Sequence, residues 1–125
     1  MFAVECLDHV ALKVSDLERS VEWYTRVLGL RRCHEGAWDV PVVLCAGTTG
    51  VALFPAGSGD TPAPVRQTVG MSHFAFRVTR AGLAEARDVF RRLDVEFSFE
   101  DHDIAHSLYV HDPDGHKVEL TTYEV

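Results

Sequence analysis

Hydrophobic and polar residues alternate with a period of two near the start of the chain, over residues 5–14. One face carries Leu7, His9, Ala11 and Lys13, and the other carries Val10, Leu12 and Val14. This alternation predicts a strand. Ser15 and Glu18 then match a capping box, and apolar residues at helical spacing predict a helix that ends at Gly29. Three short strands are predicted next, over residues 30–38, 41–46 and 50–55, with a hairpin turn at residues 47–50.

The second half of the chain repeats this order. Residues 71–78 alternate as a strand, and Thr79 can cap a helix that runs through Arg92. Strands are predicted over residues 95–99, 106–111 and 116–122, with a type I turn at residues 112–115. The order β-α-β-β-β, found twice, predicts an α+β fold with curved sheets. We expect one domain, with module one at about residues 1–56, a polar linker at 57–70 and module two at about 71–125.

His9 and His73 occupy matching positions on the first strand of each half, and Glu119 follows on the last predicted strand. A duplication would place the two histidines symmetrically about one cavity. A set of two histidines and one carboxylate leaves coordination positions open for a substrate, so it points to chemistry rather than to a structural metal. Neutral imidazole and carboxylate suit Fe(II), Mn(II), Ni(II) or Zn(II), and the ligand types alone do not select among them.

Composition narrows the possible partners and the compartment. The net charge of −7 and the lack of a basic stripe argue against nucleic-acid binding. No apolar run approaches the ~20 residues that a membrane helix needs, and the first residues lack the features of a signal peptide. Cys6, Cys33 and Cys45 are an odd count with no close pair, which predicts buried free thiols in a reducing cytoplasm.

Motifs spread along nearly the whole chain carry a family resemblance. They are Leu7–Leu12, Ser15–Ser20, Trp23-Tyr24 with Leu28-Gly29-Leu30, Ser72–Phe76, and Ser107–Val110 with Asp112–Leu120. Together they resemble the vicinal oxygen chelate superfamily, which includes glyoxalase I, type I extradiol dioxygenases, fosfomycin-resistance enzymes and bleomycin-binding proteins. The resemblance implies two tandem βαβββ modules that form a cupped mixed β-sheet around one metal. It also implies a small-molecule substrate that chelates this metal through vicinal oxygens.

The ligand pattern separates members of this superfamily. Glyoxalase I-like enzymes use a fourth ligand on the last strand of the first module, but residues 50–55 contain no Glu, Gln or His. Extradiol dioxygenases use three ligands and carry a tyrosine ten residues before the glutamate, where this chain has Tyr109. Their acid/base histidine would fall at Glu100, which is a departure. His102 or His106 could take that role, because imidazole exchanges protons near neutral pH.

The extradiol resemblance favours an Fe(II) enzyme that opens a catechol-type ring beside its two oxygens. Catecholate and dioxygen would take the open metal positions, Tyr109 would hydrogen-bond a substrate oxygen, and His102 or His106 would move protons. Single-domain relatives often complete the cup across a dimer, so a homodimer is expected. His9 of one subunit could then join His73 and Glu119 of the other.

Other members of the superfamily remain as alternatives. A fosfomycin-type transferase would use the same three ligands and cationic groups for a phosphonate, but Arg77, Lys13 and Lys117 form no cluster in the sequence. A lyase or isomerase is also open. A non-catalytic drug-binding protein would use an acidic, aromatic groove, which Trp23 or Trp38 could supply. The intact set of three ligands argues against that binding protein.

Overall fold

A computed structural model of the chain describes residues 1–57 and 69–125. The chain divides into two compact units, Met1–Asp60 and Thr61–Val125, and each unit is described by itself. Most of the linker expected at residues 57–70 falls on residues 58–68, which lie outside the described part of the chain.

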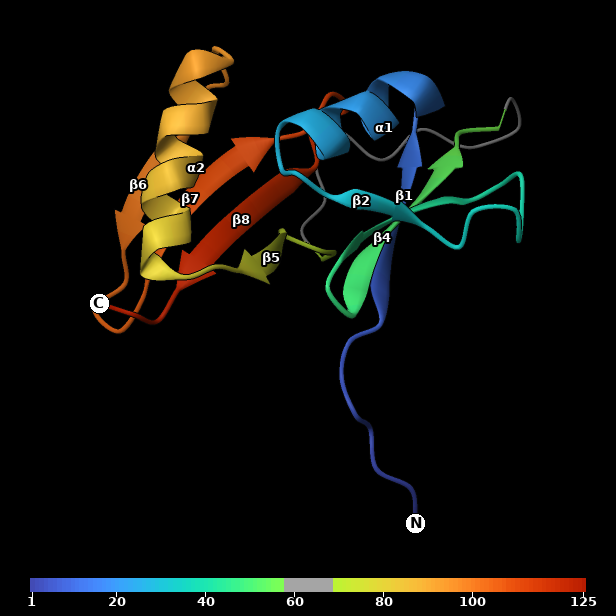
Figure 1. Cartoon of the computed structure of the whole chain (residues 1–125). Helices are drawn as coiled ribbons and strands as arrows, with labels where there is room; N and C mark the ends of the chain where they lie inside the picture. Colours follow the sequence, from blue (N-terminus) through green and yellow to red (C-terminus); the bar gives the residue numbers. More distant parts are fainter. Residues whose placement is uncertain (58–68) are drawn as a thin grey trace. The chain divides into compact units, whose positions relative to one another are not determined.

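The first unit is a four-stranded mixed sheet with one helix (Figure 1). Its elements are β1 (His9–Val14), α1 (Leu17–Arg26), β2 (Arg31–Cys33), β3 (Val42–Ala46) and β4 (Thr49–Pro55). The strand order is β1-β4-β3-β2, with β1 parallel to β4 and the other neighbours antiparallel. The β1–β4 pair is parallel because the chain crosses over through α1 and then returns along two antiparallel strands.

Helix α1 covers one face of this sheet, where it packs against β3 and β4. Leu12 and Val14 of β1 and Leu44 and Leu53 of β3 and β4 are buried, together with Tyr24 of the helix. The alternate residues of β1, which include His9, are exposed. The predicted alternation of the first strand is therefore confirmed, and His9 lies on the sheet face turned away from α1.

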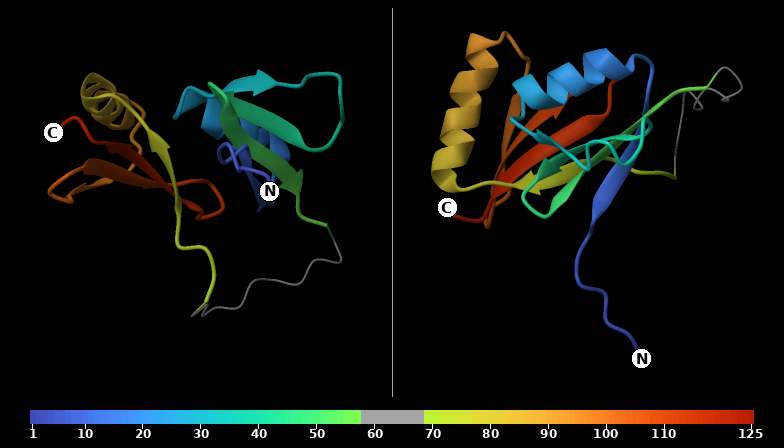
Figure 2. Two further views of the ribbon diagram at one scale, coloured as in Figure 1. Left: turned by 90° about the horizontal axis from the view of Figure 1, so that it is seen from below. Right: turned by 45° about the vertical axis from the view of Figure 1, so that its right-hand side comes forward.

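The second unit repeats the architecture of the first. Its elements are β5 (Phe74–Arg77), α2 (Arg80–Arg92), β6 (Ser98–Asp101), β7 (His106–His111) and β8 (Lys117–Thr122). The strand order is β5-β8-β7-β6, with β5 parallel to β8. Figure 2 shows α2 along one side of its own sheet. The predicted order β-α-β-β-β is therefore present in both halves.

Hydrophobic burial against α2 holds the second unit together. Phe90 of α2 is fully buried, and Leu108, Val110, Val118 and Leu120 of β7 and β8 are also buried. Arg87 of α2 lies over the Phe99 ring at 4.9 Å, which places Phe99 on the helix-covered face. Tyr109 and Glu119 are one residue out of phase with the apolar residues of their strands, so they lie on the opposite face.

The helix caps agree only in part with those predicted from the sequence. Thr79 caps α2 as predicted, because its hydroxyl accepts a hydrogen bond from the Gly82 N–H at 2.9 Å. Helix α1 is capped by Asp16, whose carboxylate accepts from the Arg19 N–H at 3.1 Å, and not by Ser15. The Ser15 hydroxyl accepts instead from the Arg19 guanidinium at 2.8 Å. Serine and aspartate are both favoured N-cap residues, and the backbone conformation of the turn places Asp16 at the N-cap position.

Several predicted strands are shorter or shifted. Strand β2 covers only part of the predicted residues 30–38, because His34 and Gly36 have positive φ angles of 56° and 82° and end the pairing. Strand β5 begins after His73, and β1 begins at His9 rather than at residue 5. Strand β6 starts three residues later than predicted, because Asp94 has a φ of 55° and Val95 still bonds back to the Phe90 carbonyl.

The prediction of buried free cysteines is wrong. Cys33 and Cys45 form a disulfide across the β2–β3 hairpin, with their Cα atoms 6.0 Å apart, and Cys6 is an exposed thiol. Twelve residues separate the bonded pair, and only the hairpin register brings them together. The cysteines therefore give no support to a reducing compartment. Among the described residues, no helix is long and apolar enough to span a bilayer.

Replacing Phe90 by alanine should strongly destabilise the protein. Phe90 is 0% exposed, and the substitution leaves a cavity beneath α2. We expect a loss of about 3–5 kcal/mol in the free energy of unfolding, measured by urea denaturation. Phe2→Ala is the matched control, because Phe2 is 86% exposed and its removal should change stability little. Equal effects of the two variants would contradict this account of the core.

Candidate metal centre

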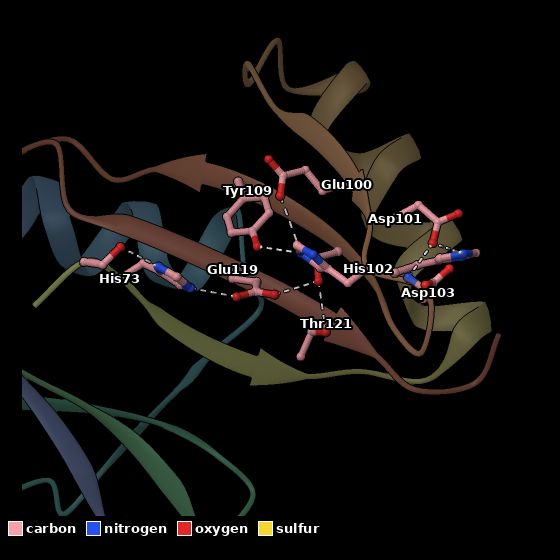
Figure 3. A network of polar contacts seen from close by, with 11 residues as sticks. His73, Glu100, Asp101, His102, Asp103, Tyr109, Glu119 and Thr121 are labelled. Atoms are coloured by element: carbon pink, nitrogen blue, oxygen red, sulfur yellow. Dashed lines mark hydrogen bonds and ion pairs between the residues drawn. The ribbon is translucent and has the colours of Figure 1, made fainter.

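Two of the predicted ligands lie together in the second unit. His73 directly precedes β5, and Glu119 lies in the middle of β8, the strand that pairs with β5. The His73 Nε2 and Glu119 Oε1 atoms are 2.9 Å apart (Figure 3). Glu119 is only 8% exposed, so its carboxylate is held in a largely dehydrated position. A buried carboxylate needs such partners, because burial without them is costly.

A serine hydroxyl contacts the remaining polar atom of each side chain, which is Nδ1 in His73 and Oε2 in Glu119. The Ser107 hydroxyl donates to Glu119 Oε2 at 2.6 Å and lies 3.0 Å from the Thr121 hydroxyl. The Ser72 hydroxyl lies 2.9 Å from His73 Nδ1. These contacts leave His73 Nε2 and Glu119 Oε1 facing each other. Hydrogen bonds to the non-ligating atoms of histidine and carboxylate side chains orient the ligands of protein metal sites.

The donor set fits a divalent metal ion. An imidazole nitrogen and a carboxylate oxygen are both good ligands for first-row divalent metals. Binding would replace the direct His73–Glu119 hydrogen bond with two bonds to the ion. His73 would then carry its ring proton on Nδ1 and donate a hydrogen bond to the Ser72 hydroxyl. The two atoms that face each other are therefore the ones that could hold the ion.

Tyr109 lies beside this pair. The β7–β8 register places Tyr109 directly opposite Glu119, and the Tyr109 and His73 rings meet edge to face with centroids 5.6 Å apart. Burial raises the pKa of the Tyr109 phenol, and the nearby carboxylates of Glu119 and Glu100 raise it further. Tyr109 therefore keeps its proton at neutral pH, and it can donate a hydrogen bond.

The two candidate proton carriers lie on different sides of the sheet. His102 Nε2 is 3.0 Å from the Tyr109 hydroxyl and 3.5 Å from a Glu100 carboxylate oxygen (Figure 3). His106 is three residues from Tyr109 on the same strand, so it points to the opposite face. There it lies 3.6 Å from an Asp101 carboxylate oxygen and contacts the Phe99 ring. The structure brings His102, but not His106, to Tyr109.

His9 belongs to the first unit and is described there. It is the first residue of β1, and its side chain is 49% exposed. His9 Nδ1 lies 2.8 Å from an Asp8 carboxylate oxygen. This contact engages one ring nitrogen and leaves Nε2 available to a metal ion, and carboxylate–histidine–metal contacts have the same arrangement.

Two hollows in the second unit border the candidate site. One of about 310 Å³ is lined by Met71–Phe74, His111 and Gly115–Lys117. Another of about 400 Å³ is lined by Glu96–Ser98, Tyr109 and His111. Volumes of this order suit small organic ligands. The His73 and Tyr109 side chains therefore both border space that a small molecule can enter.

Sequence reasoning missed the two serines. Ser72 precedes His73, and Ser107 lies two residues before Tyr109 on β7, in register with Thr121. A signal was present, because alternation places Ser107, Tyr109, Glu119 and Thr121 on one sheet face once β7 and β8 are paired. The pairing register was needed to connect Ser107 with Glu119 across the hairpin.

Comparison with known proteins identifies a family and several relatives. A family model described as the Glyoxalase/Bleomycin resistance protein/Dioxygenase superfamily matches residues 6–120. Biphenyl-2,3-diol 1,2-dioxygenase 3 of Rhodococcus globerulus is 32% identical over 126 residues, covering 91% of this chain but only 61% of that protein. Glutathione transferase FosA of Serratia marcescens is 29% identical over 117 residues, covering 94% of this chain and 80% of that protein.

Solved structures share the fold. A lactoylglutathione lyase from Agrobacterium tumefaciens has a TM-score of 0.73 at 24% identity, covering 95% of this chain and 94% of that one. A glyoxalase/dioxygenase from Nostoc punctiforme has a TM-score of 0.78 at 19% identity, covering 98% and 97%. At these identities the similarity concerns the fold alone. It confirms the predicted α+β fold of paired βαβββ modules.

Removing the Ser107 hydroxyl should weaken metal binding. Ser107→Ala deletes the hydrogen bond that fixes Glu119 Oε2, so the carboxylate loses its orientation. We expect the affinity for Mn²⁺ to fall about 10–100-fold, measured by calorimetric titration. Mn²⁺ is chosen because it favours nitrogen and oxygen ligands over thiolates.

Ser20→Ala is the matched control for this experiment. Ser20 is also fully buried, but it lies in α1 of the other unit, and its hydroxyl has no hydrogen-bond partner among the described residues. We expect this variant to bind Mn²⁺ as the parent protein does. An unchanged affinity in Ser107→Ala would contradict the assigned role of the Ser107 hydroxyl.

Proposed function

Because the chain belongs to the Glyoxalase/Bleomycin resistance protein/Dioxygenase superfamily, we propose that it is a metal-dependent enzyme acting on a small molecule with vicinal oxygens. The favoured reaction is ring-opening oxidation of a catechol-type diol. The observation that carries the proposal is the 2.9 Å approach of His73 Nε2 to Glu119 Oε1, with Tyr109 directly opposite Glu119. The similarity to a biphenyl-diol dioxygenase supports the same reaction.

The proposed ligands are His9, His73 and Glu119. Fe(II) is favoured, with Mn(II), Ni(II) or Zn(II) as alternatives, because two histidines and a carboxylate with open positions are typical of non-haem iron oxygenases. When bound, the ion would supply a Lewis acid and a template for the two substrate oxygens. The ligands would be kept in orientation by hydrogen bonds to their non-ligating atoms from Ser72, Ser107 and Asp8.

Tyr109 and His102 would act on the substrate itself. The Tyr109 phenol, kept protonated by its raised pKa, would donate a hydrogen bond to a substrate oxygen. His102, at 3.0 Å from the Tyr109 hydroxyl, would take a proton from the diol as it binds. Glu100, at 3.5 Å from His102, would stabilise the imidazolium that forms. His106 has no part in this scheme, because its strand position directs it to the other face.

A transferase of the FosA type is the second candidate function. The similarity to Glutathione transferase FosA covers 80% of that protein, a larger share than for the dioxygenase. Lys117 also lies 4.6 Å from the centre of the Tyr109 ring and would place a positive charge beside an anionic substrate. Conjugation of glutathione to an epoxide, without consumption of dioxygen, would favour this function over ring opening.

Metal analysis is the first test of the proposal. Protein purified without oxygen from metal-supplemented cells should carry about one iron per chain at His9, His73 and Glu119. His73→Ala should lose this metal because one of three ligands is removed. His106→Ala is the matched control, a histidine beside a carboxylate on the other sheet face, and should retain the metal. Protein that binds no divalent ion would overturn the enzyme proposal and favour a drug-binding protein.

Oxygen uptake with a panel of catechols tests the chemistry. His102→Ala should lower kcat about 100-fold or more while metal content stays unchanged, because a positioned proton acceptor is lost. His106→Ala should change kcat little. If the two variants lose activity equally, His102 is not the proton carrier. If no catechol supports oxygen uptake by the iron-loaded enzyme, the ring-opening proposal fails.

We also propose that the enzyme is a cytoplasmic homodimer whose metal centre is shared between subunits. Mixing the His9→Ala and His73→Ala variants tests this sharing, because each is expected to be inactive alone. If His9 of one subunit joins His73 and Glu119 of the other, random exchange should restore about a quarter of the intact sites. Centres formed within one chain would give no restoration. Light scattering would report the dimer directly.

A further inference from the structure

A second cluster of metal-ligating side chains lies in the first unit, away from Glu119 and His73. The Sγ atoms of Cys33 and Cys45 and a ring nitrogen of His34 all lie within 4.8 Å of one another. It is the one group of at least three His, Cys, Asp or Glu side chains with such spacing in residues 1–57 and 69–125. The two cysteines are half-buried and His34 is exposed, so the cluster can be reached from solvent.

The sheet register explains why the two sulfur atoms meet. Cys33 of β2 pairs with Val43 of β3, and Cys45 lies two residues further along β3. The cysteines are thus diagonal neighbours on one face of an antiparallel pair. Gly50 of β4, opposite Cys45, leaves room for this sulfur, because a Cβ at Gly50 would lie 3.3 Å from Cys45 Sγ. A larger residue at position 50 would crowd the cluster.

The backbone at His34 completes the cluster. Consecutive side chains of a strand point to opposite faces, so a histidine after Cys33 would normally point away from the sulfur atoms. His34 instead has a φ of 56°, in the left-handed region that non-glycine residues seldom adopt. This turn interrupts the alternation and brings the ring to the side of the cysteines. The position is fixed further by the Ala37 N–H, which donates to the His34 carbonyl at 3.2 Å.

We propose that Cys33, Cys45 and His34 form a binding site for a thiophilic divalent ion of the zinc class, available only when the Cys33–Cys45 disulfide is reduced. Two thiolates and one imidazole are a ligand set that zinc accepts, with water in the fourth position. The oxidised pair cannot bind in this way, because metal ligation requires thiolates. The disulfide and the metal are therefore mutually exclusive occupants of one site.

The redox step balances with an external dithiol. The dithiol breaks the Cys33–Cys45 bond and becomes a disulfide itself, and its two hydrogens end on the two cysteines. Binding of the divalent ion then displaces two thiol protons into solvent. Air or an added disulfide reverses the first step. Low metal affinity at acid pH is expected, because protons compete for the same sulfur atoms.

This site is distinct from the one proposed at His9. His9, Gly50 and Cys45 lie side by side on three neighbouring strands, β1, β4 and β3. The group of ligating atoms within 4.8 Å of one another contains Cys33, His34 and Cys45 and does not include His9. Sulfur ligands also distinguish the two sites, because His9, His73 and Glu119 contain none.

Cobalt binding to the reduced whole chain tests the proposal. The protein is reduced with a dithiol, freed of it by gel filtration under inert gas, and titrated with Co²⁺. We expect a thiolate-to-cobalt charge-transfer band whose full intensity corresponds to one Co²⁺ bound at the cysteines of each chain and which is bleached by Zn²⁺. The oxidised protein should show no such band. His34→Ala should weaken Co²⁺ binding at least about tenfold, because one of the three protein ligands is removed.

Matched variants separate the cluster from other binding sites. Cys6→Ser removes the exposed thiol and should leave the band intact, whereas Cys33→Ser should abolish it. His73→Ala should also leave it intact, so a failure of the proposed catalytic centre would not affect this test. Absence of the band in the reduced parent protein overturns the proposal whether or not any variant folds. Persistence of the band in Cys33→Ser, or its loss in Cys6→Ser, overturns it equally.

Discussion

The Ser107 hydroxyl holds Glu119 in a buried position, and the arrangement of the candidate metal centre follows from this 2.6 Å hydrogen bond. A carboxylate that is 8% exposed is unfavourable unless its oxygens are satisfied. Ser107 satisfies one oxygen and His73 the other. Tyr109 is then placed opposite Glu119 by the same β7–β8 pairing. If β8 slipped by one residue in that register, Glu119 would turn to the face covered by α2 and lose its contact with Ser107.

The two units are repeats in architecture but not in chemistry. In the first unit β1 pairs Ala11 with Ala52, and in the second β5 pairs Ala75 with Glu119. Ala52 is thus the counterpart of Glu119, and the first unit contributes no carboxylate there. Its corresponding sheet face carries His9 and the two bonded cysteines instead. One architecture therefore supports two different donor sets, one of nitrogen and oxygen and one of sulfur and nitrogen.

The sequence pattern predicted the wrong state for the paired cysteines. An odd count with no close pair favoured free thiols, yet the hairpin joins Cys33 to Cys45. Strand β2 ends early because His34 turns left-handed, and this same turn brings the histidine toward the sulfur atoms. Local propensity indicated neither the early end of β2 nor the left-handed turn at His34. A short strand and one unusual backbone angle decide the chemistry of this part of the chain.

Periodicity in the sequence was sufficient to predict two βαβββ modules, the Thr79 cap and the two faces of β1, because these depend on local alternation and capping. The repeat also selected His9 and His73 as candidates, since duplication places equivalent residues alike, and Glu119 was added from the last predicted strand. Only the tertiary structure decided that Ser107 and Ser72 contact Glu119 and His73 and that His102 rather than His106 reaches Tyr109. It alone decided that Cys33 meets Cys45. Apart from the Ser72–His73 contact between adjacent residues, these outcomes depend on pairing register or on a loop dihedral angle. Neither of these leaves a periodic pattern in the sequence.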